Sequence, residues 1–196
     1  MDHMGMAYRA RMLVSEVSLE KSVAAILTEM AARRPNVLRH SLDTAYMAAQ
    51  LLEVRGSHSS GYDLIRGALL HDCGELEIPV EVLVKPGRLT EDERRIVESH
   101  AGIGERMLRD AGFSEAVCAM ALRHHEMIDG TGYPGGLKSG SIPDDCKLLA
   151  VCDVYTALTA DRPHRKAFNM YEAADIMSGM PLGQALIMDM KKCDDI

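Results

Sequence analysis

The segment from His124 to Leu137, HHEMIDGTGYPGGL, constrains the fold most, because its four glycines and one proline exclude a continuous helix. No apolar period runs through it. Histidine is the commonest metal-binding side chain, and two adjacent histidines at a helix end can turn towards one ion only where the helix stops. A histidine pair on a soluble helix is more often a surface or core pair. The segment alone is therefore a modest indication of a metal site.

The rest of the chain has the pattern of packed helices. Its 196 residues correspond to one large or two small domains, and 47% of them are apolar and 26% charged. Two Phe, no Trp and 14 Met suit a helical core better than a sheet. Apolar residues recur at helical spacing in most segments, and we find no repeat or linker. We therefore predict a single all-α domain, a bundle of about seven to nine helices.

Charge and cysteine content limit the classes of partner. A net charge of -7 argues against duplex nucleic acid as the main partner, but leaves room for a small phosphorylated ligand. No apolar run approaches membrane-spanning length, and the N-terminus lacks a signal-peptide core. The five cysteines form no CxxC pair, which fits reduced, buried thiols in a cytoplasmic protein. They are Cys73, Cys118, Cys146, Cys152 and Cys193.

Three parts of the chain differ in pattern. Residues 1–17 are poorly patterned, and we expect part of this segment to be disordered. Residues 18–35 form an N-terminal helix with Ser18 as its N-cap, and residues 36–196 form the main domain. Within that domain, Gly56 is expected to end a helix, and Thr90 with Glu93 matches the capping-box pattern that begins one.

Seven nitrogen or oxygen ligands lie at helix ends or on buried helix faces. A lone histidine on such a face is usually a core or boundary residue, but the set as a whole is too large for one ion. Two ions that share one bridging carboxylate would use all seven. The set is His40, His71, Asp72, His100, His124, His125 and Asp153.

Several of these residues lie in longer motifs, in the order His, His-Asp, Asp. The motifs are RHS at 39–41, LLHDCG at 69–74, IPVEVLVKPGRLTEDE at 78–93, HHEMIDGTGYPGG at 124–136 and DVYTALTADRPHRKA at 153–167. This order resembles the HD superfamily of metal-dependent phosphohydrolases. The glycine loop resembles its HD-GYP branch, the cyclic di-GMP phosphodiesterases. The similarity extends roughly from Asn36 to Ala174, and it implies an HD-domain helical bundle with a GYP loop.

The resemblance also implies roles for residues. His40, His71, Asp72 and Asp153 would hold one divalent metal ion, and His100, His124 and His125 the second, with Asp72 bridging both. Iron or manganese fits these ligands. A hydroxide between the ions would attack phosphorus in line, opening cyclic di-GMP to pGpG, with further cleavage to GMP left open. Gly132 and Tyr133 would shape the substrate pocket, and Arg162 and Arg165 would pair with phosphates.

The chain departs from the HD-GYP pattern at Glu75, where these proteins typically carry a lysine that reaches the substrate phosphate. A carboxylate there would repel a phosphate, or act as a further metal ligand, and we count Glu75 with Asp72 as a candidate catalytic residue. Trinuclear members carry a glutamate where this chain has Asn36, which favours two metals.

Three functions remain open. The first is a metal-dependent phosphodiesterase for cyclic di-GMP. The second, suggested by Glu75, is a weak or inactive module that binds a cyclic dinucleotide or a protein partner. The third is a phosphohydrolase for another nucleotide. Family members are usually output domains joined to a sensor, so this chain is expected either to act alone or to form a homodimer through its N-terminal helix.

Overall fold

The computed structural model describes residues 3–56, 61–161 and 165–193, and this part of the chain contains helices and no β-strand. The predicted all-α class is confirmed. The described ranges hold eleven α-helices, close to the expected number because α5 is a single turn. The elements are α1 (His3–Ser18), α2 (Lys21–Arg33), α3 (Pro35–Arg55), α4 (Gly61–Leu70), the 3-10 helix η1 (Cys73–Glu77), α5 (Val80–Leu83), α6 (Glu91–Glu98), α7 (His100–Asp110), α8 (Glu115–Arg123), the 3-10 helix η2 (Ser139–Ser141), α9 (Asp144–Thr159), α10 (Met170–Ser178) and α11 (Gln184–Lys191).

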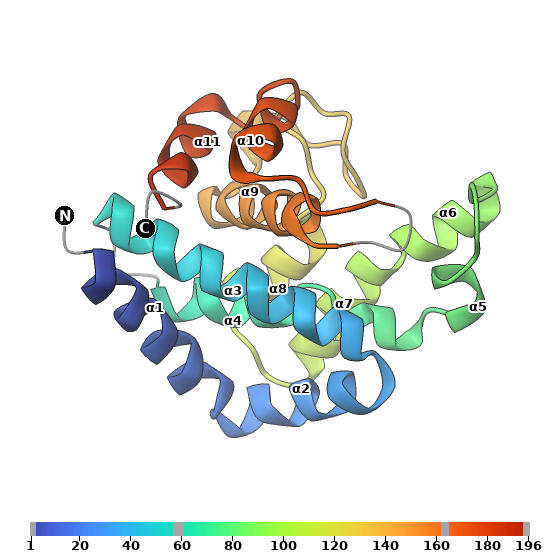
Figure 1. The fold of residues 1–196 in the computed structure, drawn as a ribbon. Helices are drawn as coiled ribbons and strands as arrows, with labels where there is room; N and C mark the ends of the chain where they lie inside the picture. Colours follow the sequence, from blue (N-terminus) through green and yellow to red (C-terminus); the bar gives the residue numbers. More distant parts are fainter. Residues whose placement is uncertain (1–2, 57–60, 162–164, 194–196) are drawn as a thin grey trace.

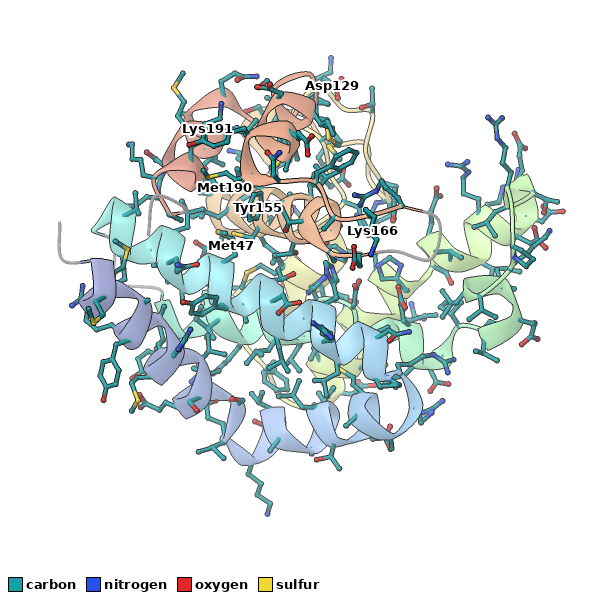
Figure 2. The ribbon with its side chains drawn as sticks, in the orientation of Figure 1. Met47, Asp129, Tyr155, Lys166, Met190 and Lys191 are labelled. Carbon is teal, nitrogen blue, oxygen red and sulfur yellow. The ribbon has the colours of Figure 1, made fainter. Side chains whose placement is uncertain are left out.

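Helix α3 crosses the middle of the molecule and packs against helices on both of its sides (Figure 1). Helices α1 and α2 lie along one side, and α9, α10 and α11 form a layer on the other. Figure 2 shows Met47, Tyr155 and Met190 where α3, α9 and α11 meet, and all three side chains are buried. These apolar contacts join the C-terminal layer to the central helix.

The predicted helix boundaries agree with the structure at two places and fail at one. Gly56 caps α3 with a φ of 64°, a left-handed conformation that suits glycine. Thr90 and Glu93 form the expected capping box of α6. The prediction that Ser18 is an N-cap is wrong, because Ser18 ends α1 and its hydroxyl donates to the carbonyl of Val14 at 2.6 Å.

Helix α1 occupies a segment for which the sequence pattern indicated no element. It buries Met6, Ala10, Val14 and Val17 against α3 and α4, whereas the large apolar residues Met4 and Tyr8 lie on its exposed face. Apolar residues on both faces hide the helical period, and this explains the failure of the pattern. The boundary expected at residue 36 stays a prediction.

Helix α9 is buried on most of its circumference, as its nearly continuous apolar sequence predicts. Asp153 lies in the middle of this helix and its side chain is also buried. A carboxylate in such surroundings requires compensating charge or hydrogen bonds, which come from α3 and from the end of α8. None of the described helices is both long enough and apolar enough to cross a bilayer.

Candidate metal centre

The structure brings together all seven ligands predicted from the sequence. Six of them fall into two groups that share Asp72, and within each group the ligand atoms lie within 4.8 Å of one another. A third group of the same kind links His71, His124 and Asp153 across the two. The first group is His40, His71 and Asp72, and the second is Asp72, His100, His124 and His125.

Helix ends position most of these side chains. Helix α4 stops at Leu70, directly before His71 and Asp72, and α8 stops at Arg123, directly before the histidine pair. His100 begins α7 after the one-residue break that follows α6. His40 and Asp153 differ from the others, because they project from within α3 and α9. Five helices that are distant in sequence therefore meet at one cluster.

Three of the histidine rings are fixed in the same way. In each, Nδ1 donates to a backbone carbonyl three residues earlier, in the last turn of the preceding helix. A carbonyl oxygen can only accept, so Nδ1 carries the proton and the lone pair of a neutral ring lies on Nε2. Such bonds orient metal-binding histidines in many proteins. The bonds join His71 to Ala68 at 2.9 Å, His100 to Val97 at 2.7 Å and His124 to Ala121 at 2.9 Å.

The Nε2 atoms of these rings face each other and the carboxylate of Asp72. Those of His100 and His124 are 3.2 Å apart, and each lies 3.4 Å from Oδ1 of Asp72. Nε2 of His71 lies 3.1 Å from Oδ2 of Asp72, and it is buried without a hydrogen-bond partner among the described residues. Two lone pairs at 3.2 Å repel unless a proton or a cation lies between them. This donor set therefore fits divalent metal ions.

The protonation of the cluster in the absence of metal follows from the same contacts. Burial alone would raise the pKa of Asp72, but the charge of His71 and bonds from His100 and His124 hold it well below its usual range. Burial opposes the charging of His71, yet Asp72 raises the pKa of that ring to about 9. Burial and the neighbouring His124 lower the pKa of His125 to about 3. A metal ion that enters must therefore displace a proton from His71.

Two polar contacts join α3 to α9 beside the cluster. Nε2 of His40 lies 2.8 Å from Oδ1 of Asp153, and this bond helps to keep the pKa of the buried carboxyl low. One turn along both helices, the buried hydroxyls of Thr44 and Thr156 are 2.8 Å apart. Thr156 donates to the carbonyl of Cys152, so Thr44 donates to Thr156. The sequence pattern had not singled out Thr44, although its spacing of four residues from His40 places both on one helix face.

Glu126 holds the glycine loop, a second feature that the sequence analysis missed. Its side chain is 3% exposed, and its two oxygens accept bonds from the backbone N–H groups of Gly135 at 2.6 Å and Leu137 at 2.7 Å. The available signal was an acid between a histidine pair and a run of glycines. Because the loop folds back on Glu126, the ring of Tyr133 lies against that of His125, with 4.7 Å between their centroids.

Gly132 allows the loop to approach the chain that follows α8. A Cβ atom at this position would fall against the carbonyl oxygen of His125 and the backbone nitrogen of Met127. Only glycine fits such a close approach of two backbone segments. Gly132 is therefore a packing requirement of the loop, and Tyr133 is the residue whose side chain faces the cluster.

Glu75 lies in η1, next to the predicted ligands. Burial, and then the charge of Asp72, raise the pKa of this carboxyl to about 7, while His100 and His71 oppose the rise. Among the described residues no hydrogen bond or ion pair engages its carboxylate. Arg34 binds the backbone of η1 instead, through the carbonyls of Glu75 and Ile78. The carboxylate is thus held near the cluster and remains available to a ligand.

Arg162 and Arg165 are the two arginines expected to bind phosphate. Arg162 lies outside the described residues. The guanidinium of Arg165 donates to the carbonyls of Ala157 and Leu158 at the end of α9, at 2.9 and 2.8 Å, and to that of Lys166 at 2.8 Å. It also lies 4.4 Å from the ring centroid of Phe168. Arg165 therefore caps a helix in this structure, and its role towards phosphate stays a prediction.

The geometry of the cluster and the helical fold agree with a comparison to known families. A family model described as HD domain matches residues 10–183. The chain belongs to the HD domain family. The resemblance to HD-GYP proteins is confirmed by relatives and by solved structures with that architecture.

The relatives in question are named as phosphodiesterases of cyclic dinucleotides. A cyclic di-GMP phosphodiesterase of Pseudomonas aeruginosa is 48% identical over 106 residues, which are 54% of this chain and 26% of the relative. The cyclic di-GMP phosphodiesterase response regulator RpfG of Xanthomonas campestris is 45% identical over 105 residues, 53% of this chain and 28% of the relative. The 3'3'-cGAMP-specific phosphodiesterase 3 of Vibrio cholerae is 34% identical over 170 residues, 86% of this chain and 37% of the relative. The chain thus spans well under half the length of each.

Two solved structures share the fold. Bd1817, an HDG"Y"P protein of Bdellovibrio bacteriovorus, superposes with a TM-score of 0.71 at 18% identity, covering 100% of this chain and 65% of that one. The HD domain of the phosphodiesterase PgpH of L. monocytogenes, in complex with cyclic-di-AMP, superposes with a TM-score of 0.67 at 18% identity, covering 86% of this chain and 92% of that one. At this identity the likeness establishes the fold alone.

Proposed function

We propose that this chain is a metal-dependent phosphodiesterase that opens cyclic di-GMP to pGpG, with GMP as a further product. The observation that carries the proposal is the arrangement of two ligand groups around one shared carboxylate, Asp72. Two ions about one bridging ligand are the arrangement used for in-line displacement at phosphorus. The names of the relatives support the choice of a cyclic dinucleotide.

In this proposal the seven ligands divide between two ions. His40, His71, Asp72 and Asp153 hold one, and His100, His124 and His125 hold the second together with Asp72. Iron or manganese suits mixed imidazole and carboxylate ligands. When bound, the two ions supply a nucleophile from water at neutral pH and neutralise charge on the phosphoryl oxygens.

The chain's own residues then orient the substrate. Nδ1 bonds to backbone carbonyls keep three imidazole rings in place without metal, so the ligands are preorganised. The ring of Tyr133 lies against that of His125, with 4.7 Å between their centroids, and in this proposal it forms the side of the substrate pocket next to the glycine loop. We assign Gly132 to the shape of this loop, and Arg162 and Arg165 to contacts with phosphate. Asp72 would be the ligand that the two ions share, and Glu75 lies beside the same site.

The experiment is to measure metal content and turnover of cyclic di-GMP on one anaerobically purified sample. We expect two metal ions per chain and formation of pGpG. Asp72→Asn should lose both metal and turnover, because it removes the ligand that both groups share. Asp92→Asn is the matched control, since Asp92 makes only exposed contacts on α6. A metal-loaded protein that leaves cyclic di-GMP intact would refute the proposal.

The carboxylate of Glu75 favours a second candidate function, a module that binds the dinucleotide without cleaving it. A negative charge near the reacting phosphate opposes the approach of an anionic substrate. Binding without turnover, with turnover gained in Glu75→Lys, would support this alternative. If Glu75 is instead an additional metal ligand, Glu75→Lys should lower metal content and remove any activity.

We also propose a cytoplasmic location. The five cysteines are free and buried, as expected of thiols in a reducing compartment. A thiol titration of the unfolded protein under denaturing, non-reducing conditions should count five free groups in protein prepared from the native host.

A further inference from the structure

A cavity of about 390 Å³ opens beside the metal centre, and none of the expected metal ligands lines it. Figure 1 shows α6, which supplies one of its walls, at the side of the molecule with α5. This volume lies in the range of small-molecule sites, about 300 to 1,000 Å³. Three separate segments form the walls. Arg88 and Leu89 precede α6, Arg94, Val97 and Glu98 belong to α6, and Tyr133 comes from the glycine loop.

Tyr133 connects the cavity to the metal centre. One side of its ring lies against His125 at 4.7 Å, and His100 is 6.5 Å away, between centroids. The same residue lines the cavity. A nucleotide with its phosphate at the ligand cluster would therefore extend its base towards α6, past the ring of Tyr133.

The charged side chains of the cavity have no partners in the described part of the chain. Within residues 3–56, 61–161 and 165–193, no hydrogen bond or ion pair engages the side chains of Arg88, Arg94 or Glu98. Arg94 and Glu98 are one turn apart on α6, a spacing that commonly forms an ion pair, yet they form none. The adjacent Arg95, which does not line the cavity, pairs with Asp92 and Glu91. The unpaired groups are thus available to a ligand.

We propose that this cavity is a guanine-selective subsite for one base of the substrate. Guanine presents two acceptors, O6 and N7, on one edge, and these match the forked donors of an arginine, Arg88 or Arg94. Its Watson–Crick edge presents N1–H and N2–H₂ donors to a carboxylate, here Glu98, which only accepts. Tyr133 offers an aromatic face, and Leu89 and Val97 provide apolar walls for the ring.

The carboxylate of Glu98 favours guanine over other ligands of similar size. A site for phosphate alone would not include an unpaired carboxylate among its lining groups, because the two anions repel. Adenine lacks the N2 donors, and its N6 amino group opposes an arginine donor where guanine has O6. Of these two purines, guanine alone offers a two-acceptor edge to an arginine and a two-donor edge to a carboxylate.

The inference rests on the proposed function, because it takes a cyclic dinucleotide as the substrate and adds the preference for its base. The test uses the metal-loaded full chain in two assays. One measures the ratio of kcat/KM for cyclic di-GMP over cyclic di-AMP, and the other measures the binding of GMP and AMP by calorimetry. The variants are Glu98→Gln, Arg94→Gln and, as the matched control on the same helix, Arg95→Gln.

In Glu98→Gln the amide group keeps the shape of the side chain but places a donor near the guanine donors. We expect the preference for guanine over adenine to fall by about 10- to 100-fold in both assays. Arg94→Gln should weaken GMP binding with little effect on AMP. Arg95→Gln should leave unchanged both the kcat/KM ratio of cyclic di-GMP over cyclic di-AMP and the relative affinity for GMP and AMP. Metal content and melting temperature should match the wild type in all three variants.

The outcomes separate the subsite from the proposed function. Cleavage of cyclic di-GMP with an unaltered base preference in Glu98→Gln would overturn the subsite and leave the function standing. Binding of GMP that depends on Glu98, without cleavage of cyclic di-GMP, would support the subsite and refute the function. If the wild type neither binds GMP nor cleaves cyclic di-GMP, both are overturned.

Discussion

Replacing Glu126 by glutamine tests whether a single buried carboxylate holds the glycine loop over the metal centre. The two oxygens of Glu126 accept from the N–H groups of Gly135 and Leu137 at 2.6 and 2.7 Å. In Glu126→Gln one oxygen remains and the other is replaced by an amide NH₂, which faces a backbone N–H donor. One charge-assisted bond is therefore lost and one buried donor is left unsatisfied.

The expected magnitude follows from these two losses. A hydrogen bond to a charged group contributes about 1.5 to 3 kcal/mol, and an unsatisfied buried donor adds a desolvation penalty of about 1 kcal/mol or more. We expect the loop to lose about 2 to 4 kcal/mol of local stability. Since about 1.4 kcal/mol corresponds to a factor of ten, protection of its amides should fall by about 30- to 700-fold.

Native-state hydrogen exchange of the amides of Gly135 and Leu137 measures this loss directly, because the loop can open without global unfolding. Glu115→Gln is the matched control. Glu115 makes an exposed pair with Arg109, so Glu115→Gln should leave the exchange of both loop amides unchanged. Unaltered exchange at Gly135 and Leu137 in Glu126→Gln would refute the reasoning.

Three further predictions concern packing, protonation and metal. Gly74→Ala should lower the free energy of unfolding by about 1 to 3 kcal/mol or more in urea denaturation, because a Cβ there meets the carbonyl of His100, whereas Gly140→Ala, with nothing within 4 Å, should not. The carboxyl of Glu75 has its pKa raised from 4.5 to about 7, so its protonated form stabilises the metal-free fold below pH 4.5, and this contribution is lost as pH rises through 7. In chelator-treated protein, Glu75→Gln should therefore raise the free energy of unfolding more at pH 8 than at pH 5, by at most about 3 kcal/mol in urea denaturation. An equal effect of the substitution at both pH values would contradict this. Adding manganese to chelator-treated protein should raise its melting temperature, more at pH 8 than at pH 6, because the imidazoles must lose protons to bind; a shift independent of pH would count against the cluster as the binding site.

The seven side chains expected from the sequence to bind metal lie close together in the structure, and their role as ligands stays a prediction. Histidine and aspartate on apolar helix faces or at helix ends are costly to bury, so their presence indicates a common partner. None of these residues was decisive alone, and the set as a whole, together with the family motifs, indicated a shared site. The structure brings all of them to one place, as the resemblance to HD-GYP proteins implied.

Other parts of the site depend on contacts between segments that are separated in sequence, and a local sequence pattern does not reveal such contacts. The bonds of Glu126 exist only because the loop returns to it nine and eleven residues later. The pair between Thr44 and Thr156 joins residues 112 positions apart. The cavity beside Tyr133 likewise needs three segments in their final positions. The prediction from sequence missed helix α1 for a different reason, since apolar residues on both faces of this helix obscured the helical period.

The bonds from Nδ1 of the three histidines to the last turns of α4, α6 and α8 also satisfy carbonyl oxygens that a helix end would otherwise leave without a hydrogen-bond donor. Fraying of one of these helix ends therefore also breaks the hydrogen bond that orients its histidine ring. Warming that loosens a terminal turn frees an imidazole to rotate while the hydrophobic core is still intact. The orientation of these three rings is therefore only as rigid as the three helix ends that hold them.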